Sequence, residues 1–135
     1  RILARRGHPR AELTRKLRDR GHDPVAIGDA FARLEALAYL EPEDELALRY
    51  AQELARKRGA TPRAVRRKLD QRGFEPRDAE RAIDQAFAGW DARVAAFETV
   101  EGIDDPDKVA RVLTRRGFAA DAIAEVVRAV RSRSS

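Results

Sequence analysis

The residues best suited to chemistry in this 135-residue chain are basic side chains gathered in one segment. Asp70 is the one acid between Arg56 and Arg72, and eight basic residues share that segment with it. Guanidinium and ammonium groups bind phosphates or carboxylates through charge-assisted hydrogen bonds. A basic run is often only a solvated face, but such a face normally intersperses acids. The segment therefore indicates a surface for an anionic partner, and charge alone does not separate nucleic-acid phosphates from an acidic protein.

The basic side chains are expected to project from the outer side of a helix. If Val65 and Leu69 face inward, the helical rotation of about 100° per residue places the neighbouring cations toward solvent. The residues that we expect to contact the partner are Arg63, Arg66, Arg67 and Lys68, with Arg56, Lys57, Arg15 and Lys16 in support.

Catalytic and metal-binding chemistry has little support in the sequence. The histidines, His8 and His22, have no nucleophile motif or metal-ligand spacing near them, and we interpret His22 as a partly buried turn residue. Asp104, Asp105 and Asp107 lack the glycine and distal glutamate of a calcium loop, so we interpret them as helix-capping residues. The absence of cysteine excludes disulfides and thiolate catalysis. We expect a protein that is not an enzyme and that needs no metal or cofactor.

The elements that position the basic residues belong to a sequence repeat. An Arg-Gly pair followed by His or Phe occurs at 20–22, 72–74 and 116–118, with spacings of 52 and 44 residues. A glycine just past a helix end is the usual left-handed C-cap. The apolar positions around the three turns recur at the same offsets: Leu13/Leu17, Val65/Leu69 and Val109/Leu113 before them, and Ile27/Ala30/Phe31/Leu34, Ala79/Ala82/Ile83/Ala86 and Ile123/Val126/Val127/Val130 after them. The chain is therefore predicted to be a tandem array of helical modules.

Further helix signals complete each repeat. Thr61-Pro62 and Asp105-Pro106 indicate an N-cap followed by proline at the first helical position. A longer first helix is expected over 43–58 and over 89–100, and only 1–6 remains of it in the first repeat. The apolar stripes of these first helices are Ala47/Tyr50/Ala51/Leu54 and Trp90/Val94/Phe97, and Trp90 is also a candidate to cover the junction between the second and third repeats.

The predicted fold is all-α, an elongated tandem array of three three-helix repeats that resemble helix-turn-helix units. No segment shows the alternation of a strand. Repeat 1 spans 1–40 and lacks part of its first helix, repeat 2 spans 41–88, and repeat 3 spans 89–135 with a frayed tail from Arg131. Because each unit is small, we expect packing between repeats to matter as much as packing within them.

The apolar runs of the sequence are too short to span a membrane, and no signal peptide is visible. The lack of cysteine suits a reducing compartment. We therefore expect a soluble, cytoplasmic monomer. Since the chain begins with arginine and contains no methionine, we interpret it as a fragment.

The order of several motifs resembles the RecX family. The motifs are Tyr39-Leu40, the acids from Glu41 to Glu45, Leu46-Ala47, the basic stretch 58–69 with its glycine, and Arg72-Gly73-Phe74. The family pattern reads Gly-Tyr-Leu-Asp-Asp, an aromatic-Ala pair, a basic helix end with glycine, and a Leu-x-x-Lys/Arg-Gly-hydrophobic turn. The resemblance covers nearly the whole chain, because RecX proteins are tandem three-helix repeats of this size.

This resemblance implies a regulator of RecA, the bacterial recombinase. RecX proteins bind in the helical groove of the RecA filament on single-stranded DNA, where they limit filament growth and suppress ATP hydrolysis, strand exchange and coprotease activity. The partner implied here is therefore the RecA filament. The residues leave two alternatives open. In one, a helix-turn-helix-like module binds single- or double-stranded DNA independently of RecA. In the other, the chain is a scaffold with no basic contact surface.

Overall fold

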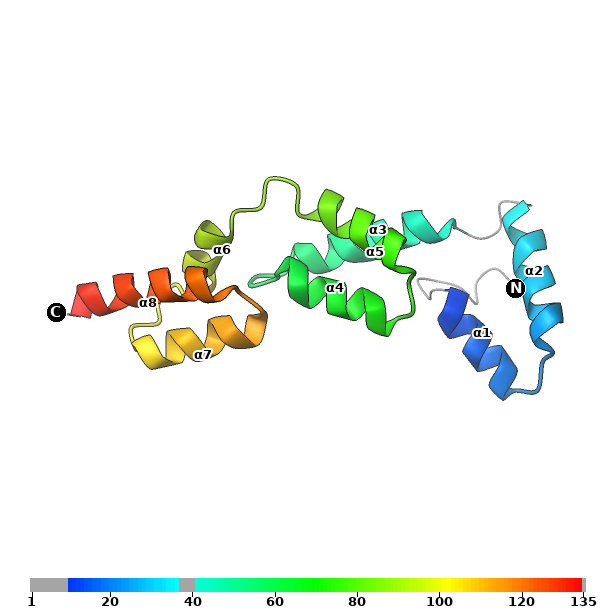
Figure 1. Ribbon diagram of the computed structural model, residues 1–135, viewed down its shortest axis with the longest axis horizontal. Helices are drawn as coiled ribbons and strands as arrows, with labels where there is room; N and C mark the ends of the chain where they lie inside the picture. The colour runs from blue at the N-terminus through cyan, green and yellow to red at the C-terminus, as the bar shows by residue number, and fades with distance from the viewer. Residues whose placement is uncertain (1–9, 37–40, 135) are drawn as a thin grey trace.

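The computed structural model describes residues 10–36 and 41–134, and these ranges contain α-helices and no strand (Figure 1). This confirms the all-α class. The helices are α1 Arg10–Asp19, α2 Pro24–Ala36, α3 Glu43–Ala55, α4 Pro62–Gln71, α5 Pro76–Ala86, α6 Ala92–Thr99, α7 Pro106–Arg116 and α8 Ala120–Ser134.

Local sequence signals explain where these helices begin and end. The Thr61 hydroxyl accepts a hydrogen bond from Ala64 N at 3.2 Å, and the Asp105 carboxylate accepts one from Asp107 N at 3.1 Å, so both predicted N-caps are confirmed. The glycines of the three Arg-Gly turns, Gly21, Gly73 and Gly117, have φ angles of 90°, 90° and 94°. Each therefore ends its helix in the left-handed conformation that glycine adopts without strain.

The buried apolar residues form three separate clusters, one for each of three groups of helices. We call α1 and α2 module 1, α3 to α5 module 2, and α6 to α8 module 3. Each cluster draws its side chains from one of the segments predicted as repeats, and the exact repeat boundaries stay a prediction. The buried members are Leu13, Ile27 and Phe31 in module 1, Leu46, Ala47, Ala51, Leu54, Val65, Leu69, Phe74, Ala79 and Ala82 in module 2, and Ala96, Val100, Val109, Leu113, Phe118, Val126 and Val130 in module 3.

Contacts between the helices of different modules are sparse, and hydrogen bonds, an ion pair and the ring of Trp90 join the modules. Every pair of helices with extensive contacts lies within one module. The expectation that packing between repeats matters as much as packing within them is therefore wrong for the described residues. The physical reason is that each module already buries its apolar stripes in its own cluster, so few apolar side chains are left to join the modules.

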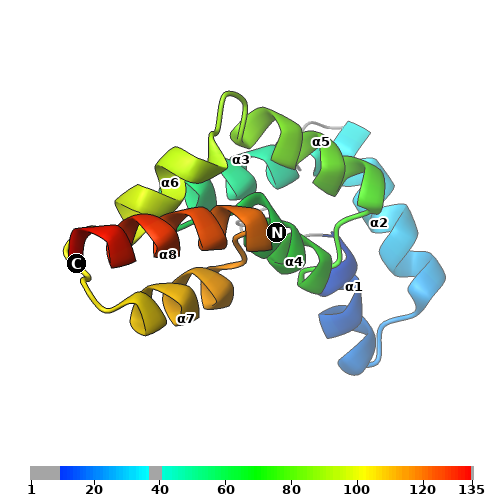
Figure 2. The same cartoon turned by 60° about the vertical axis from the view of Figure 1, so that its left-hand side comes forward.

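The modules follow one another along an elongated molecule (Figure 1). The helices that precede the three Arg-Gly turns, α7, α4 and α1, succeed one another along one side in both views (Figures 1 and 2). The C-terminal end of α7 meets the N-terminal end of α4, and the C-terminal end of α4 meets the N-terminal end of α1. This arrangement brings opposite ends of the helix dipoles together, which is electrostatically favourable.

Three sequence predictions about helices are wrong in detail. The helix expected to reach Arg58 ends at Ala55, because the chain turns there and Gly59 takes a φ of 79°. The tail from Arg131, expected to fray, continues α8 to Ser134, and its arginines suit a helix C-terminus. The remnant helix expected over 1–6 lies outside the described residues.

The third correction concerns the face that α6 buries. Val94 is 56% exposed and Phe97 38% exposed, although both belonged to the predicted inward stripe. Asp91 caps the helix by accepting hydrogen bonds from Arg93 N and Val94 N, so α6 begins only at Ala92. Ala96 and Val100 then face the core of module 3.

Within the described residues, none of the helices combines the length and apolar character needed to cross a membrane.

Candidate functional site

Helix α4 presents its basic side chains outward, as its apolar spacing predicts. Val65 is 3% exposed and Leu69 is fully buried. Arg63, Arg67 and Lys68 are exposed on the same helix.

Arg66, the fourth basic residue of α4, lies in a different setting. Its side chain is half-buried, and its Nε atom lies 3.1 Å from Asp70 Oδ1 one helical turn away. This ion pair partly neutralises the guanidinium. Arg66 is therefore the weakest partner-contact candidate on α4.

The four supporting candidates separate into two places. Arg56 and Lys57 are exposed in the turn after α3, close to the start of α4. Arg15 and Lys16 are exposed on α1 in module 1, and Lys16 Nζ lies 3.7 Å from Glu12 Oε1. The structure thus brings Lys57 next to the cations of α4, whereas Arg15 and Lys16 belong to another module.

A cleft between modules 2 and 3 gathers basic residues from both of them. It has a volume of about 180 Å³ and is lined by five cations, which define what we call the basic cleft: Lys57, Arg58, Lys68, Arg115 and Arg116. Its remaining lining residues are small or apolar, and no acid is among them. The cleft therefore offers a place for an anion contributed by a partner.

Sequence reasoning missed Arg115 and Arg116 as candidate site residues. Both lie at the C-terminal end of α7, in the third Arg-Gly turn, where arginine is explained by the helix dipole alone. A signal was present in the sequence, since these two consecutive arginines precede the glycine with no acid beside them. Only the docking of α7 against α4 shows that they face the cations of module 2.

One buried hydroxyl joins the two modules at the cleft. Thr61, at the start of α4, is only 1% exposed. Its Oγ1 donates a hydrogen bond to the Arg116 carbonyl oxygen at 2.7 Å while it accepts the capping bond from Ala64 N. An added Cβ at Gly117 would lie 2.9 Å from this oxygen. Only glycine at position 117 therefore leaves room for the Thr61 hydroxyl.

Two arginines reinforce the junction by donating hydrogen bonds across it. Arg116 Nη1 donates to the Arg58 carbonyl oxygen at 3.1 Å, and Arg58 Nη2 donates to the Glu98 carbonyl oxygen at 2.6 Å. Arg58 Nη2 also lies 4.0 Å from Glu101 Oε2. The two modules thus exchange arginine-to-carbonyl bonds in both directions.

Modules 1 and 2 meet in the same way. An added Cβ at Gly73 would lie 2.9 Å from Ala11 Cβ at the start of α1. Arg72 Nε lies 3.2 Å from Glu12 Oε2. In both junctions, therefore, the Arg-Gly turn of one module packs against the first turn of a helix in the preceding module. These helices are α4 in module 2 and α1 in module 1.

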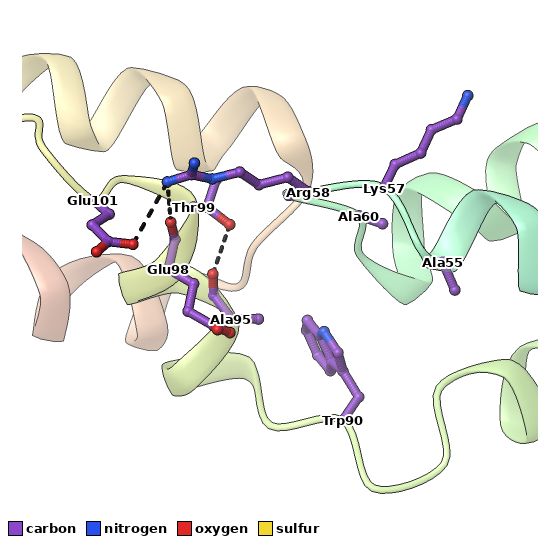
Figure 3. A pocket seen from close by; sticks show the side chains of 10 residues that line it. Ala55, Lys57, Arg58, Ala60, Trp90, Ala95, Glu98, Thr99 and Glu101 are labelled. Carbon is purple, nitrogen blue, oxygen red and sulfur yellow. Dashed lines mark hydrogen bonds and ion pairs between the residues drawn. The ribbon is translucent and has the colours of Figure 1, made fainter.

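A second cavity, of about 420 Å³, lies on the other side of the Arg58-Gly59 turn (Figure 3). Trp90 points into it, toward that turn. The indole meets Phe87 of module 2 edge-on at 5.8 Å and stacks on Phe118 of module 3 at 6.1 Å. This confirms the prediction that Trp90 covers the junction.

Other candidate chemistry finds little support in the structure. His22 is exposed, so its interpretation as a partly buried turn residue is wrong, whereas Phe74 and Phe118 at the equivalent positions are buried. Module 1 has the smallest of the three buried clusters, so it offers little apolar cover to a side chain at this turn. His8 lies outside the described residues. Over 10–36 and 41–134, no group of three or more His, Asp or Glu side chains is placed to hold a metal ion.

One arginine away from the junction has a perturbed titration. The hydrogen bond with Glu41 raises the pKa of Arg49, and the charge of Glu53 adds to the effect. The carboxylates of Glu41 and Glu53 thus stabilise the charged form of Arg49.

Comparisons with known proteins point to one family. The family model described as RecX, first three-helix domain, matches residues 1–34. Regulatory protein RecX of Pseudomonas syringae pv. tomato is 33% identical over 133 residues, which cover 93% of this chain and 84% of the relative. Regulatory protein RecX of Pseudomonas fluorescens is 34% identical with the same coverage, and that of Halorhodospira halophila is 37% identical over 91% of this chain and 80% of the relative. No solved structure matches the chain.

Proposed function

This chain belongs to the RecX family of regulatory proteins, and on that premise we propose that it regulates RecA by binding RecA filaments on single-stranded DNA. The proposed effect is mainly inhibitory: the bound chain limits filament extension and lowers ATP hydrolysis, strand exchange and coprotease activity. In this proposal it works in the cytoplasm as a monomeric binding protein, with no catalytic step and no cofactor of its own.

The basic surface on a modular array is the observation that supports this proposal best. The exposed cations of α4 and those of the basic cleft lie midway along a molecule built from three separate cores. A long array of modules can contact several neighbouring protomers of a filament at once. Several weak contacts made together bind far more tightly than any one of them.

Duplex reading by a helix-turn-helix is the alternative function, and the charge of α5 counts against it. In such a motif, the second of the two helices, which directly follows the turn, enters the major groove. In module 2 this helix is α5, which carries three acids and two bases. Helix α4, before the turn, carries four bases and one acid. A net acidic recognition helix is unfavourable beside DNA phosphates.

The decisive experiment is a titration of this chain into a RecA ATPase assay on single-stranded DNA. The proposal predicts falling ATP hydrolysis, together with tighter binding to RecA-coated DNA than to bare DNA at the same salt concentration. Binding to bare DNA that equals or exceeds binding to the filament would favour the alternative.

A pair of matched variants tests the α4 surface within this assay. Arg63→Glu with Arg67→Glu reverses two exposed cations on α4, and Arg77→Glu with Arg81→Glu reverses two exposed cations at the equivalent places of α5. Both pairs are on the surface, so each should cost less than about 1 kcal/mol of stability. We expect the α4 pair to weaken inhibition by more than tenfold and the α5 pair to leave it nearly unchanged. Equal inhibition by both folded variants would exclude α4 as the contact surface.

A further inference from the structure

The residues that the structure describes balance only part of the positive charge of the basic cleft. Arg116 is held by the Arg58 carbonyl oxygen, and Arg58 lies near Glu101. For Lys57, Lys68 and Arg115 the described residues provide no ion pair. Cations brought together from two modules repel one another unless an anion lies between them. The cleft therefore has the electrostatics of a binding site whose anion comes from outside.

The second cavity, which Trp90 lines, adds an aromatic contact next to the charged contacts of the basic cleft. Both cavities are lined by the same turn, from Lys57 to Ala60, which separates them. Lys57 and Arg58 line both cavities, and the second cavity is also lined by Glu98, Glu101 and Trp90, the single tryptophan of the sequence (Figure 3). A ligand that extends from the basic cleft across the turn would reach the indole ring, and its anionic groups would stay in the basic cleft, away from Glu98 and Glu101.

We propose that the junction of modules 2 and 3 is a binding site for single-stranded nucleic acid, with backbone phosphates in the basic cleft and a base beside Trp90. Proteins that bind single strands without sequence preference combine a basic groove with aromatic side chains on which bases stack. An acidic peptide accounts for the cations but makes no use of the indole. This site deepens the proposed function and rests on it, because the strand that binds here is taken to be the single-stranded DNA that RecA coats.

Thr61 is the positioning residue of this site. Lys57, Arg58 and Lys68 come from module 2, whereas Arg115 and Arg116 come from module 3, so the cleft is complete only while the two modules are docked. The Thr61 hydroxyl holds the end of α7 against the start of α4 without lining the cleft itself. Removing this hydroxyl should therefore weaken strand binding although no cation is lost.

Trp90 supplies the readout, since its fluorescence reports on the junction alone. The intact chain, without RecA, is titrated with oligothymidylate at several salt concentrations. We expect saturable quenching of Trp90 and an affinity that falls steeply with salt. Lys68→Gln with Arg115→Gln should lower the affinity at least tenfold and reduce the salt slope by about 1.4, because two phosphate contacts to a single strand are lost. Arg63→Gln with Arg67→Gln removes the same charge outside the cleft and should change the affinity less than threefold.

The threonine variants test the positioning role in the same titration. Thr61→Val should lower the affinity severalfold, and Thr61→Ser, which keeps the hydroxyl, should restore it. Thr114→Val removes a hydroxyl from the exposed side of α7 and serves as the control. Circular dichroism establishes that every variant is folded before it is titrated.

Several results would overturn this site. They are an absence of quenching by oligothymidylate, equal losses for the cleft and outer pairs, or tighter binding of polyglutamate, measured by its displacement of oligothymidylate, which would make the cleft an acidic-protein site. The proposed function fails separately. A chain that binds oligothymidylate through the cleft but leaves RecA ATP hydrolysis unchanged keeps this site and loses the regulatory role.

Discussion

The glycine of the Arg-Gly turn has two tasks at the scale of single residues. It adopts the left-handed conformation that ends a helix, which is a property of the turn itself. In Gly73 and Gly117 it also allows the close approach of the preceding module, whereas no described atom lies within 4 Å of an added Cβ at Gly21. The three copies therefore have the same backbone geometry but different surroundings.

This difference predicts unequal costs for the same substitution. Gly21→Ala should cost about 1 to 2 kcal/mol, from left-handed strain alone. Gly117→Ala carries the same strain and also displaces the Thr61 hydroxyl, so we expect a total of about 3 kcal/mol or more. Amide hydrogen exchange in modules 1 and 3 measures each loss locally. Equal losses at the two glycines would show that the turn acts only as a helix cap.

At the scale of elements, α6 shows how a helix start decides which face is buried. Asp91 caps the helix, and the small Ala96 lies fully buried against the core of module 3. The larger Phe97 remains partly exposed on the neighbouring face. Hydrophobic size alone would place the phenylalanine inside, but a short helix buries one narrow stripe, and the side chains at the helix crossing must fit the available space.

Two truncations, one within α6 and one at its C-cap, should therefore lower stability in the reverse order of side-chain size: the smaller side chain should cost more. Val100, at the end of this helix, is 3% exposed, so Val100→Ala should destabilise module 3 by about 2 kcal/mol. Phe97→Ala should cost less than about 1 kcal/mol, because much of its ring is already in water. Thermal unfolding of the two variants checks the order. A larger loss for Phe97 would mean that α6 packs with the face predicted from the sequence.

At the scale of the whole molecule, three separate cores joined by a few hydrogen bonds, an ion pair and Trp90 imply three units of stability. Leu69 in module 2 and Leu113 in module 3 are both fully buried at equivalent positions of their repeats. Their clusters share no buried residue. Local opening is governed by the contacts within each cooperative unit.

Leu69→Ala and Leu113→Ala should accordingly act on different modules of the molecule. Each should cost about 2 to 5 kcal/mol in its own module. Hydrogen exchange monitored by mass spectrometry should show lost protection in that module and little change in the other. Uniform loss of protection along the chain in either variant would contradict the independence of the cores.

The sequence by itself determined the helices and most of their buried faces. Proline and Thr61 at the start of α4, the apolar pair Val65 and Leu69, and the glycine after Arg72 act within a few residues of one another, so their effect is visible in the linear order. The outward direction of the α4 cations follows from the same spacing. The exposure of His22 and the choice of which face α6 buries were not predictable in this way. Both depend on the apolar side chains that the rest of the module places against them.

The tertiary structure alone decided how the modules meet. The bonds that close the junction connect Thr61 to Arg116, Arg116 to Arg58 and Arg58 to Glu98, across 55, 58 and 40 residues of sequence. All three end on backbone carbonyl oxygens, which every residue carries, so the acceptor leaves no mark in the sequence. The basic cleft depends on these bonds, and for that physical reason the role of Arg115 and Arg116 emerges only from the fold.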